Sequence, residues 1–192
     1  MRIFLAGASG VIGVRLVPLL TGAGHSVVGL TRTASKTETL RELGAEPVVG
    51  DVYEADWLAE TVAKAASDLV MHQLTDLPDD SARIPEHVAG NSRIRIEGTD
   101  NLLAAARQSG EPRFIAQSVA WSLEGEGAAG VEHLERVITE YDGTVLRYGQ
   151  FYGPGTYHEG PPPPPRIHID EAARRTVEHL EADPGIVQIV EQ

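Results

Sequence analysis

The sequence contains no cysteine and no long apolar run. Without cysteine the chain forms no disulfide, thiolate nucleophile or sulfur-ligated metal site, so catalysis must use oxygen or nitrogen groups or a bound cofactor. No hydrophobic stretch approaches the roughly 20 residues that cross a bilayer, which excludes a membrane span. Met1 and Arg2 lead directly into a strand rather than into a secretory signal, and we therefore expect a cytoplasmic protein.

Basic residues are also few. The 16 lysines and arginines are outnumbered by 28 aspartates and glutamates, which gives a formal net charge of -12. Because nucleic-acid phosphates require a basic surface, this charge argues against nucleic acid and favours a small-molecule partner. The seven histidines are scattered, without the spacing of a metal site. A length of 192 residues suits a single domain covering residues 1–192.

Apolar runs alternate with segments of helical periodicity along most of the chain. Strands are predicted at residues 2–6, 26–31, 46–49, 68–72, 113–116 and 144–147, and helices at 11–20, 37–43, 57–66, 94–108 and 131–141. Strands separated by helices predict a parallel, doubly wound sheet with right-handed crossovers. The predicted fold class is α/β, a Rossmann fold in three αβα layers.

The segment "GPGTYHEGPPPPPR" at residues 153–166 interrupts this alternation. Its five consecutive prolines predict a stiff polyproline II rod of roughly 15 Å. We interpret the segment as a rigid surface connector, with a site for a proline-binding partner as the alternative. Beyond it, Asp170 is expected to cap a last helix ending near Leu180, and residues 186–190 to form a closing strand.

The opening "IFLAGASGVIG" at residues 3–13 places three glycines where a buried strand runs into a helix. In a dinucleotide-binding βαβ unit, such glycines allow a tight turn, close approach of the pyrophosphate and close packing of helix on strand. Main-chain N–H groups at the helix start then hold the phosphates. The cofactor-binding residues predicted here are Gly7, Ser9, Gly10, Val11, Ile12 and Gly13.

The end of the second strand, "LTRTASK", contains no carboxylate to take the ribose hydroxyls of NAD. It offers Thr31, Arg32, Thr33 and Lys36 instead. Arg32 can grip a 2′-phosphate in bidentate fashion and Lys36 adds a point charge, so NADPH is predicted over NADH. The alternative is a solvated basic loop.

Further cofactor contacts are predicted after the later strands. Asp51 is placed to accept a hydrogen bond from the adenine amino group, because it directly follows the third strand. The remaining predicted cofactor-binding residues are Val52, Gln73, Leu74, Thr75, Ser118 and Tyr148. His72 ends the fourth strand and is either a proton donor or a structural histidine.

Five segments share their order and spacing with a known family. They are "GASGVIG" at 7–13, "GDV" at 50–52, "EGTDNLLAAARQSGEPRFIAQS" at 97–118, "LRYGQFYGPGT" at 146–156 and "IHIDEAA" at 167–173. The sequence thereby resembles the extended or atypical short-chain dehydrogenase/reductases, and most closely their NAD-dependent epimerase/dehydratase type. This resemblance implies a nicotinamide cofactor and hydride transfer to or from a carbonyl.

The family's proton relay is missing. Family members use a serine or threonine together with a tyrosine and a lysine spaced YxxxK, in which the tyrosine supplies the proton and the lysine lowers its pKa. No tyrosine here has lysine four residues later. Glu135 resembles the family glutamate that follows the motif, and counting back from it puts Gly127 at the tyrosine position and Val131 at the lysine position.

Some of the family's other site positions are recognisable. Ser118 lies near the catalytic serine position, with Val119 as the other register, and Arg95 stands where the family has asparagine. Only "YHEGPPPPPR" remains where the family inserts a substrate-covering lobe, so the C-terminal substrate region is minimal. We expect an open pocket, or one covered by a second copy in a homodimer or by a partner protein.

Four aromatic residues are placed by the resemblance near the nicotinamide, where a flat substrate could stack. They are Trp121, Phe151, Tyr152 and Tyr157, with core packing as the alternative for Phe151. Arg95 is the candidate for holding an anionic substrate group, unless it turns to solvent. The catalytic candidates are Ser118 and His72.

Hydride transfer needs an enzymic acid only when the product anion is too basic to exist free. A ketone yields an alkoxide, whereas a quinone yields a phenolate-like anion with a pKa of about 10. The missing relay therefore favours an NADPH-dependent oxidoreductase acting on a small hydrophobic carbonyl or quinone. This class includes the reductase part of a hydroxylating, monooxygenase-type system. The alternatives are a non-catalytic NADP-binding sensor similar to the NmrA-like proteins and, third, a sugar-nucleotide epimerase or dehydratase.

Overall fold

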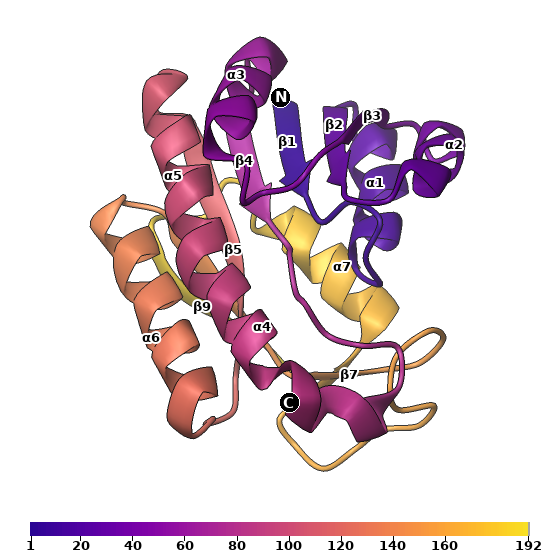
Figure 1. Cartoon of the computed structure of the whole chain (residues 1–192). Helices are drawn as coiled ribbons and strands as arrows, with labels where there is room; N and C mark the ends of the chain where they lie inside the picture. Colours follow the sequence, from indigo (N-terminus) through magenta and orange to yellow (C-terminus); the bar gives the residue numbers. More distant parts are fainter. Residues whose placement is uncertain (192) are drawn as a thin grey trace.

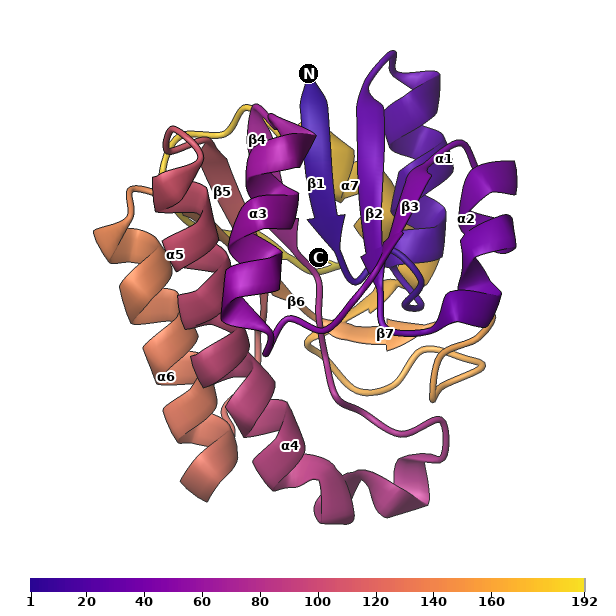
Figure 2. The same cartoon turned by 45° about the horizontal axis from the view of Figure 1, so that its top comes forward.

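Seven parallel strands form one sheet in the computed structural model, which describes residues 1–191 (Figures 1 and 2). They are β1 (Arg2–Ala6), β2 (Ser26–Thr31), β3 (Glu46–Val49), β4 (Leu69–His72), β5 (Arg113–Val119), β6 (Thr144–Tyr148) and β9 (Gly185–Ile189). Their order across the sheet is β3-β2-β1-β4-β5-β6-β9. The predicted doubly wound α/β fold is confirmed. The strand order reverses between β1 and β4, the place where such sheets bind ligands.

Helices cover both faces of the sheet. On one face lie α1 (Gly13–Gly22), α2 (Thr37–Glu42) and α7 (Ile169–Glu178), and on the other α3 (Ala55–Ala65), α5 (Thr99–Gln108) and α6 (Gly125–Glu140). Strand β1 shows why. Ile3 and Leu5 join the core on the α1 side, while Phe4 joins the core on the α3 side. A strand buried on both faces needs an unbroken apolar run, and "IFLA" provides it.

The helix predicted at residues 94–108 is the last part of a longer helical run. The run begins with η2 (Ser81–His87), continues as α4 (Val88–Arg93), passes through a π-helical turn, η3 (Ile94–Gly98), and ends as α5. The predicted start was wrong because Pro85 and a mixed polar pattern obscure residues 81–93. π-Helical turns are rare and occur frequently at functional sites.

Helix α6 also begins earlier than predicted, at Gly125 rather than near residue 131. Its first turns, "GEGAAG", are poor helix formers by propensity. They are nonetheless suited to this place, because a Cβ added at Gly130 would lie 3.0 Å from the Cα of Ser92 in α4. Tertiary packing of α4 against α6 therefore overrides the local preference.

The C-terminal segment forms a second, two-stranded sheet of β7 (Gln150–Tyr152) and β8 (Arg166–His168). The proline run before β8 is not a straight polyproline II rod, since it bends over residues 163–165 and contains a cis Pro164–Pro165 bond. The cap of α7 is His168, whose Nδ1 accepts the N–H of Asp170, so the prediction that Asp170 itself is the cap was wrong.

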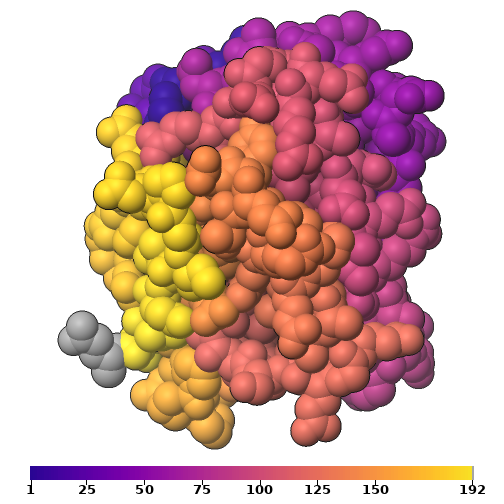
Figure 3. Space-filling model, turned by 90° about the vertical axis from the view of Figure 1, so that its left-hand side faces the viewer, coloured from indigo at the N-terminus to yellow at the C-terminus, as the bar shows by residue number. Residues whose placement is uncertain are grey.

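Strand β9 lies at the edge of the main sheet, next to β6. The space-filling view shows this yellow C-terminal segment at the surface beside the orange atoms of the α6 and β6 region (Figure 3). In the described chain, no helix is long and apolar enough to cross a membrane. Nor do residues 1–191 bring together three or more His, Asp or Glu side chains as a metal would need.

Candidate functional site

The turn between β1 and α1 is built from the predicted glycines. Gly7 has φ +92°, and an added Cβ there would lie 2.6 Å from the carbonyl oxygen of Gln73. At Gly13 a Cβ would lie only 2.2 Å from the carbonyl oxygen of Gly7. Both positions therefore require glycine, one for its backbone conformation and both for close approach. The roles predicted for these two residues agree with this geometry.

Two main-chain donors at the start of α1 are free for a ligand. Gly10 donates its N–H to Gly7, and Val14 donates to Gly10. Within residues 1–191, the N–H groups of Val11 and Ile12 make no hydrogen bond. Free donors at a helix start, together with the helix dipole, form an anion-binding site of the kind that holds pyrophosphate.

A groove runs from this turn across the carboxyl ends of the neighbouring strands. Ten of the predicted cofactor-binding residues line it: Gly7, Ser9, Gly10, Thr31, Arg32, Thr33, Val52, Gln73, Leu74 and Thr75. Leu30, Gly50 and Ile94 also line it and were not predicted. Gly50 had a readable signal, because a glycine directly after a strand commonly marks a turn.

The other predicted cofactor-binding residues lie outside the lining of this groove. They are Val11, Ile12, Gly13, Lys36, Asp51, Ser118 and Tyr148. Lys36 is exposed at the end of η1 (Ala34–Lys36), and Ile12 is buried in the core. The Asp51 carboxylate accepts the N–H of Tyr53 at 3.0 Å, which orders the turn after β3.

At the adenosine end, Arg32 is already paired. Its guanidinium lies 2.9 Å from the Asp76 carboxylate, and both side chains are partly exposed. Asp76 is itself held in place, because its N–H donates to the Asn91 side chain at 3.0 Å and its carboxylate leaves no room for a Cβ at Gly90. Thr31 serves the turn, with its hydroxyl 2.7 Å from that of Ser9. A 2′-phosphate would therefore compete with Asp76 for Arg32.

His72 is fully buried at the end of β4. Its Nδ1 accepts the N–H of Leu74 at 3.2 Å, and its Nε2 lies 3.0 Å from the Thr99 hydroxyl. Burial, reinforced by the nearby charge of Arg95, lowers the pKa of His72 to about 3. The imidazole is therefore neutral with both nitrogens engaged. This arrangement corresponds to the structural alternative and not to the proton-donor candidate.

Ser118, at the end of β5, is 4% exposed and committed to Glu135 of α6. Its hydroxyl donates to Glu135 Oε1 at 2.6 Å, and Arg147 of β6 adds bonds of 2.8 Å and 2.5 Å to the two carboxylate oxygens. These hydrogen bonds outweigh the effect of burial and hold the pKa of Glu135 below its usual value. Because the Ser118 hydroxyl donates its hydrogen bond to Glu135, it can only accept a hydrogen bond from a substrate.

Arg95 lies in the π-helical turn η3 and is buried rather than turned to solvent. Burial lowers its pKa, and the negative charge of Glu135 opposes that shift. Its charge acts on His72, so it lies near the end of β4, and its role in holding an anionic substrate group stays a prediction. Within residues 1–191, no hydrogen bond or ion pair involves its guanidinium.

A buried polar chain lies beneath the groove. The hydroxyl of Tyr148 is 2.6 Å from that of Thr176, and the Gln73 amide nitrogen is 3.5 Å from Tyr148. Burial is the main reason that the pKa of Tyr148 rises to about 12. The Gln73 Oε1 atom is buried without a partner among residues 1–191. Tyr148 thus belongs to the support of the groove and not to its lining.

The four aromatic candidates for substrate binding do not form one cluster. Phe151 packs on the core with its ring 5.2 Å from that of Tyr148, as the packing alternative predicts. Tyr157 is 38% exposed and donates its hydroxyl to the carbonyl of Pro78. Trp121 is half-buried in the loop after β5.

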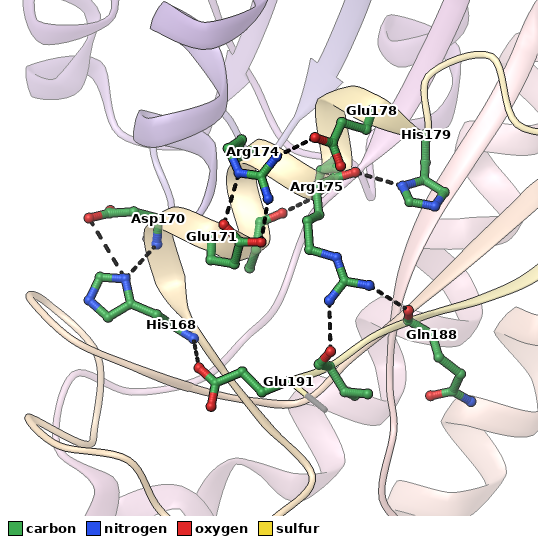
Figure 4. Close-up of polar contacts among 12 residues, drawn as sticks. His168, Asp170, Glu171, Arg174, Arg175, Glu178, His179, Gln188 and Glu191 are labelled. Atoms are coloured by element: carbon green, nitrogen blue, oxygen red, sulfur yellow. Dashed lines mark hydrogen bonds and ion pairs between the residues drawn. The ribbon is translucent and has the colours of Figure 1, made fainter.

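Tyr152 belongs to a separate polar network near the C-terminus. Its hydroxyl donates to Glu191 at 2.5 Å, and Glu191 also accepts the N–H of His168 at 3.2 Å. Figure 4 shows His168 with Glu191 and, as a separate set of ion pairs on α7, Arg174 between Glu171 and Glu178. The Tyr152 hydroxyl is therefore engaged away from the groove, which does not favour the substrate role predicted for it.

Comparison with known proteins agrees with this arrangement. The model of the NAD dependent epimerase/dehydratase family matches residues 3–121. A "3-diazoavenalumate denitrifying reductase" from a Streptomyces species is 36% identical over 180 residues, which cover 81% of this chain. The matched region spans only 58% of that reductase, so the chain is similar to little more than half of it.

Solved structures share the fold. A UDP-glucose 4-epimerase from Thermus thermophilus, in complex with NAD, superposes with a TM-score of 0.81 at 18% identity, covering 99% of this chain and 78% of the epimerase. A putative NAD-dependent epimerase/dehydratase from Bacillus halodurans has a TM-score of 0.77 at 20% identity and is covered over 94% of its length. The chain belongs to the NAD-dependent epimerase/dehydratase family, as an atypical member of the short-chain dehydrogenase/reductases.

Proposed function

We propose that this protein is an NADPH-dependent oxidoreductase that delivers hydride to a conjugated acceptor, a quinone or similar carbonyl, whose product needs no enzymic proton donor. The observation that carries the proposal is the combination of an intact glycine turn with a reacting centre that has neither tyrosine nor lysine at the YxxxK positions. The first feature retains a dinucleotide, and the second removes the acid that a ketone would require.

The residues present fit a nicotinamide dinucleotide. Gly7 and Gly13 let the backbone pack closely enough to form the tight turn, and the free N–H groups of Val11 and Ile12 suit the pyrophosphate. Arg32 would hold a 2′-phosphate once it leaves Asp76. When bound, NADPH supplies a hydride and becomes NADP⁺.

The state of Ser118 supports an acceptor other than a simple ketone. The Ser118 hydroxyl already donates its only hydrogen bond to Glu135, and His72 is neutral and buried, so neither residue is ready to protonate an alkoxide. The similar Streptomyces protein is named as a reductase of a diazo compound rather than of a ketone. That name supports reduction of a conjugated acceptor within the same family.

The test is NADPH oxidation by the purified protein, followed by absorbance, with naphthoquinones and anthraquinones beside simple aldehydes and ketones. We expect turnover with the quinones alone. Arg32→Ala should weaken NADPH binding about tenfold and leave NADH binding unchanged, because only NADPH carries the 2′-phosphate. Oxidation with simple ketones as fast as with quinones would contradict the proposal.

The second candidate is an NADP-binding sensor without catalysis. It is favoured by the dispersal of the aromatic residues, since Phe151 and Tyr152 are engaged in structural contacts. Calorimetry separates the two functions. NADPH binding without oxidation by any acceptor would assign the chain to the sensor class.

A further inference from the structure

Arg95 is a largely buried cation without a direct partner among residues 1–191. Its side chain is only 7% exposed, yet within the described part of the chain its guanidinium has no hydrogen-bond or ion-pair partner. Burying an unpaired charge is costly, and buried arginines are normally paired. Its neighbour Ile94 lines the groove, and its charge acts on His72, so Arg95 lies near the carboxyl end of β4 beside the groove.

The nearby Glu135 carboxylate makes no ion pair with Arg95, because both of its oxygens already accept hydrogen bonds from other residues. Glu135 accepts the Ser118 hydroxyl and one Arg147 nitrogen on Oε1, and a second Arg147 nitrogen on Oε2. The positive charges of Arg95 and Arg147 therefore both lie near the single carboxylate of Glu135, while the adjacent His72 is neutral. The cluster retains one unbalanced positive charge, and Arg95 carries it.

The helix packing fixes where this charge lies. Ser92 precedes Arg95 by three residues and so lies on the same side of the helix. The Ser92 hydroxyl donates to the carbonyl of Glu126 at 2.7 Å, and its Cα would meet a Cβ at Gly130 at 3.0 Å. Arg95 therefore lies on the side of the helix that packs against α6, where the charge of Glu135 acts on it.

We propose that Arg95 is a catalytic residue that binds the oxygen of a conjugated carbonyl acceptor and stabilises the negative charge that this oxygen gains on hydride transfer. The proposal rests on the proposed function and names the group that replaces the tyrosine–lysine pair. The acceptor class is a flat quinone-like molecule whose reduced form is an anion at neutral pH or close to it.

The chemistry balances without an enzymic acid. The C–H bond at C4 of the dihydronicotinamide breaks, and the hydride forms an O–H bond at one quinone oxygen. The ring becomes aromatic and an electron pair passes to the other oxygen, so the product is a hydroquinone monoanion. The negative oxygen is held by Arg95 and later takes a proton from water. NADPH, the hydride donor, ends as NADP⁺. An alkoxide from a ketone is far more basic than this anion and would still need the missing acid.

The first experiment compares Arg95→Met, Arg95→Lys and Arg136→Gln with the wild type in NADPH oxidation by 1,4-naphthoquinone. Arg136 is an exposed arginine of α6 paired with Glu140 and serves as the matched control for loss of a charge. Removing an electrostatic stabiliser of a developing anion typically costs about 100-fold or more in kcat. We expect this loss for Arg95→Met, partial recovery for Arg95→Lys, and no change for Arg136→Gln.

Thermal unfolding distinguishes a catalytic from a structural arginine. Replacing an unpaired buried charge by an apolar side chain of similar length should raise Tm, so Arg95→Met should be more stable and less active at once. NADPH affinity should stay within about twofold. A lower Tm, or an unchanged kcat, would overturn the proposal, because the first indicates a structural arginine and the second a dispensable one.

An anion probe tests Arg95 even if no acceptor is turned over. We expect 2-naphthoate, added with NADP⁺, to raise the Tm of the wild type and of Arg136→Gln but not that of Arg95→Met. Equal stabilisation of all three proteins would refute the anion site. The wild-type protein could show this selective response although none of the acceptors supports NADPH oxidation. In that case the proposed function fails and the anion site at Arg95 is retained.

Discussion

The two halves of the groove are built in opposite ways. On the side of β1 and β2, backbone geometry dominates: glycines let backbone segments pack closely, main-chain donors are free, and the ion pair of Arg32 with Asp76 is partly exposed. On the side of β4 and β5, buried side chains dominate, with Ser118, Glu135 and Arg95 forming a charged cluster. The half of the groove at β1 and β2 is thus organised by backbone shape, and the half at β4 and β5 by charge.

The largest effect is expected from a substitution in the glycine turn between β1 and α1. Gly13→Ala places a Cβ 2.2 Å from the Gly7 carbonyl oxygen, so α1 must shift away from β1. We expect NADPH affinity, measured by calorimetry, to fall about 100-fold, equivalent to about 2.7 kcal/mol. Gly22→Ala, in the last turn of the same helix with no atom within 4 Å, is the control and should bind normally. Tight binding by Gly13→Ala would show that the phosphates lie elsewhere.

The charged half should be sensitive to acid. Because the pKa of His72 is lowered to about 3, the unfolded chain takes up a proton below about pH 6.5 that the folded chain refuses. Stability is therefore present above that pH and declines towards pH 3, by up to about 1.4 kcal/mol per pH unit. Denaturant unfolding of His72→Gln should show a shallower pH dependence than the wild type over this window. Identical slopes would show that His72 titrates normally.

A smaller effect on cofactor affinity is expected from the ion pair between Arg32 and Asp76. Asp76→Asn releases Arg32 from its ion pair, so NADPH affinity should rise about three- to tenfold while NADH affinity stays unchanged. Asp79→Asn makes the same change in net charge at an exposed position nearby and controls for long-range electrostatics. An equal gain in both variants would mean that the ion pair does not limit binding.

The smallest effect concerns Tyr152, which the family resemblance places at the nicotinamide and the structure ties to Glu191. Tyr152→Phe removes one hydrogen bond to a charged group near the surface and should lower Tm only slightly, as measured by thermal unfolding. We expect its kcat and KM with 1,4-naphthoquinone to match those of the wild type. A raised KM would return Tyr152 to the substrate site.

The backbone half could be predicted from the sequence because its signals are local. Gly7, Gly10 and Gly13 are neighbours in the chain, and an apolar run before them identifies the strand. Arg32 was likewise found from its place after β2. Its pairing with Asp76 was not, since 44 residues separate the two and nothing local indicates that they meet.

The charged half depends on such distant pairings throughout. Ser118 contacts Glu135 across 17 residues, and Glu135 contacts Arg147 across a further 12. The position of Arg95 was recognised by resemblance, but its burial depends on the π-helical turn, which has no sequence signature strong enough to predict. The early start of α6 was missed because glycines count against a helix until the partner helix is known.

The contact of Gly130 with Ser92 has a consequence for the energetics of the reaction. Because Gly130 has no side chain, Ser92 of α4 lies directly against the backbone of α6, and the turn that carries Arg95 follows this close contact. The backbone that carries the guanidinium is therefore in place before any acceptor arrives. An acceptor that gains negative charge there would require little rearrangement of the protein around it. A low reorganisation energy is the condition under which a single cation accelerates a reaction most.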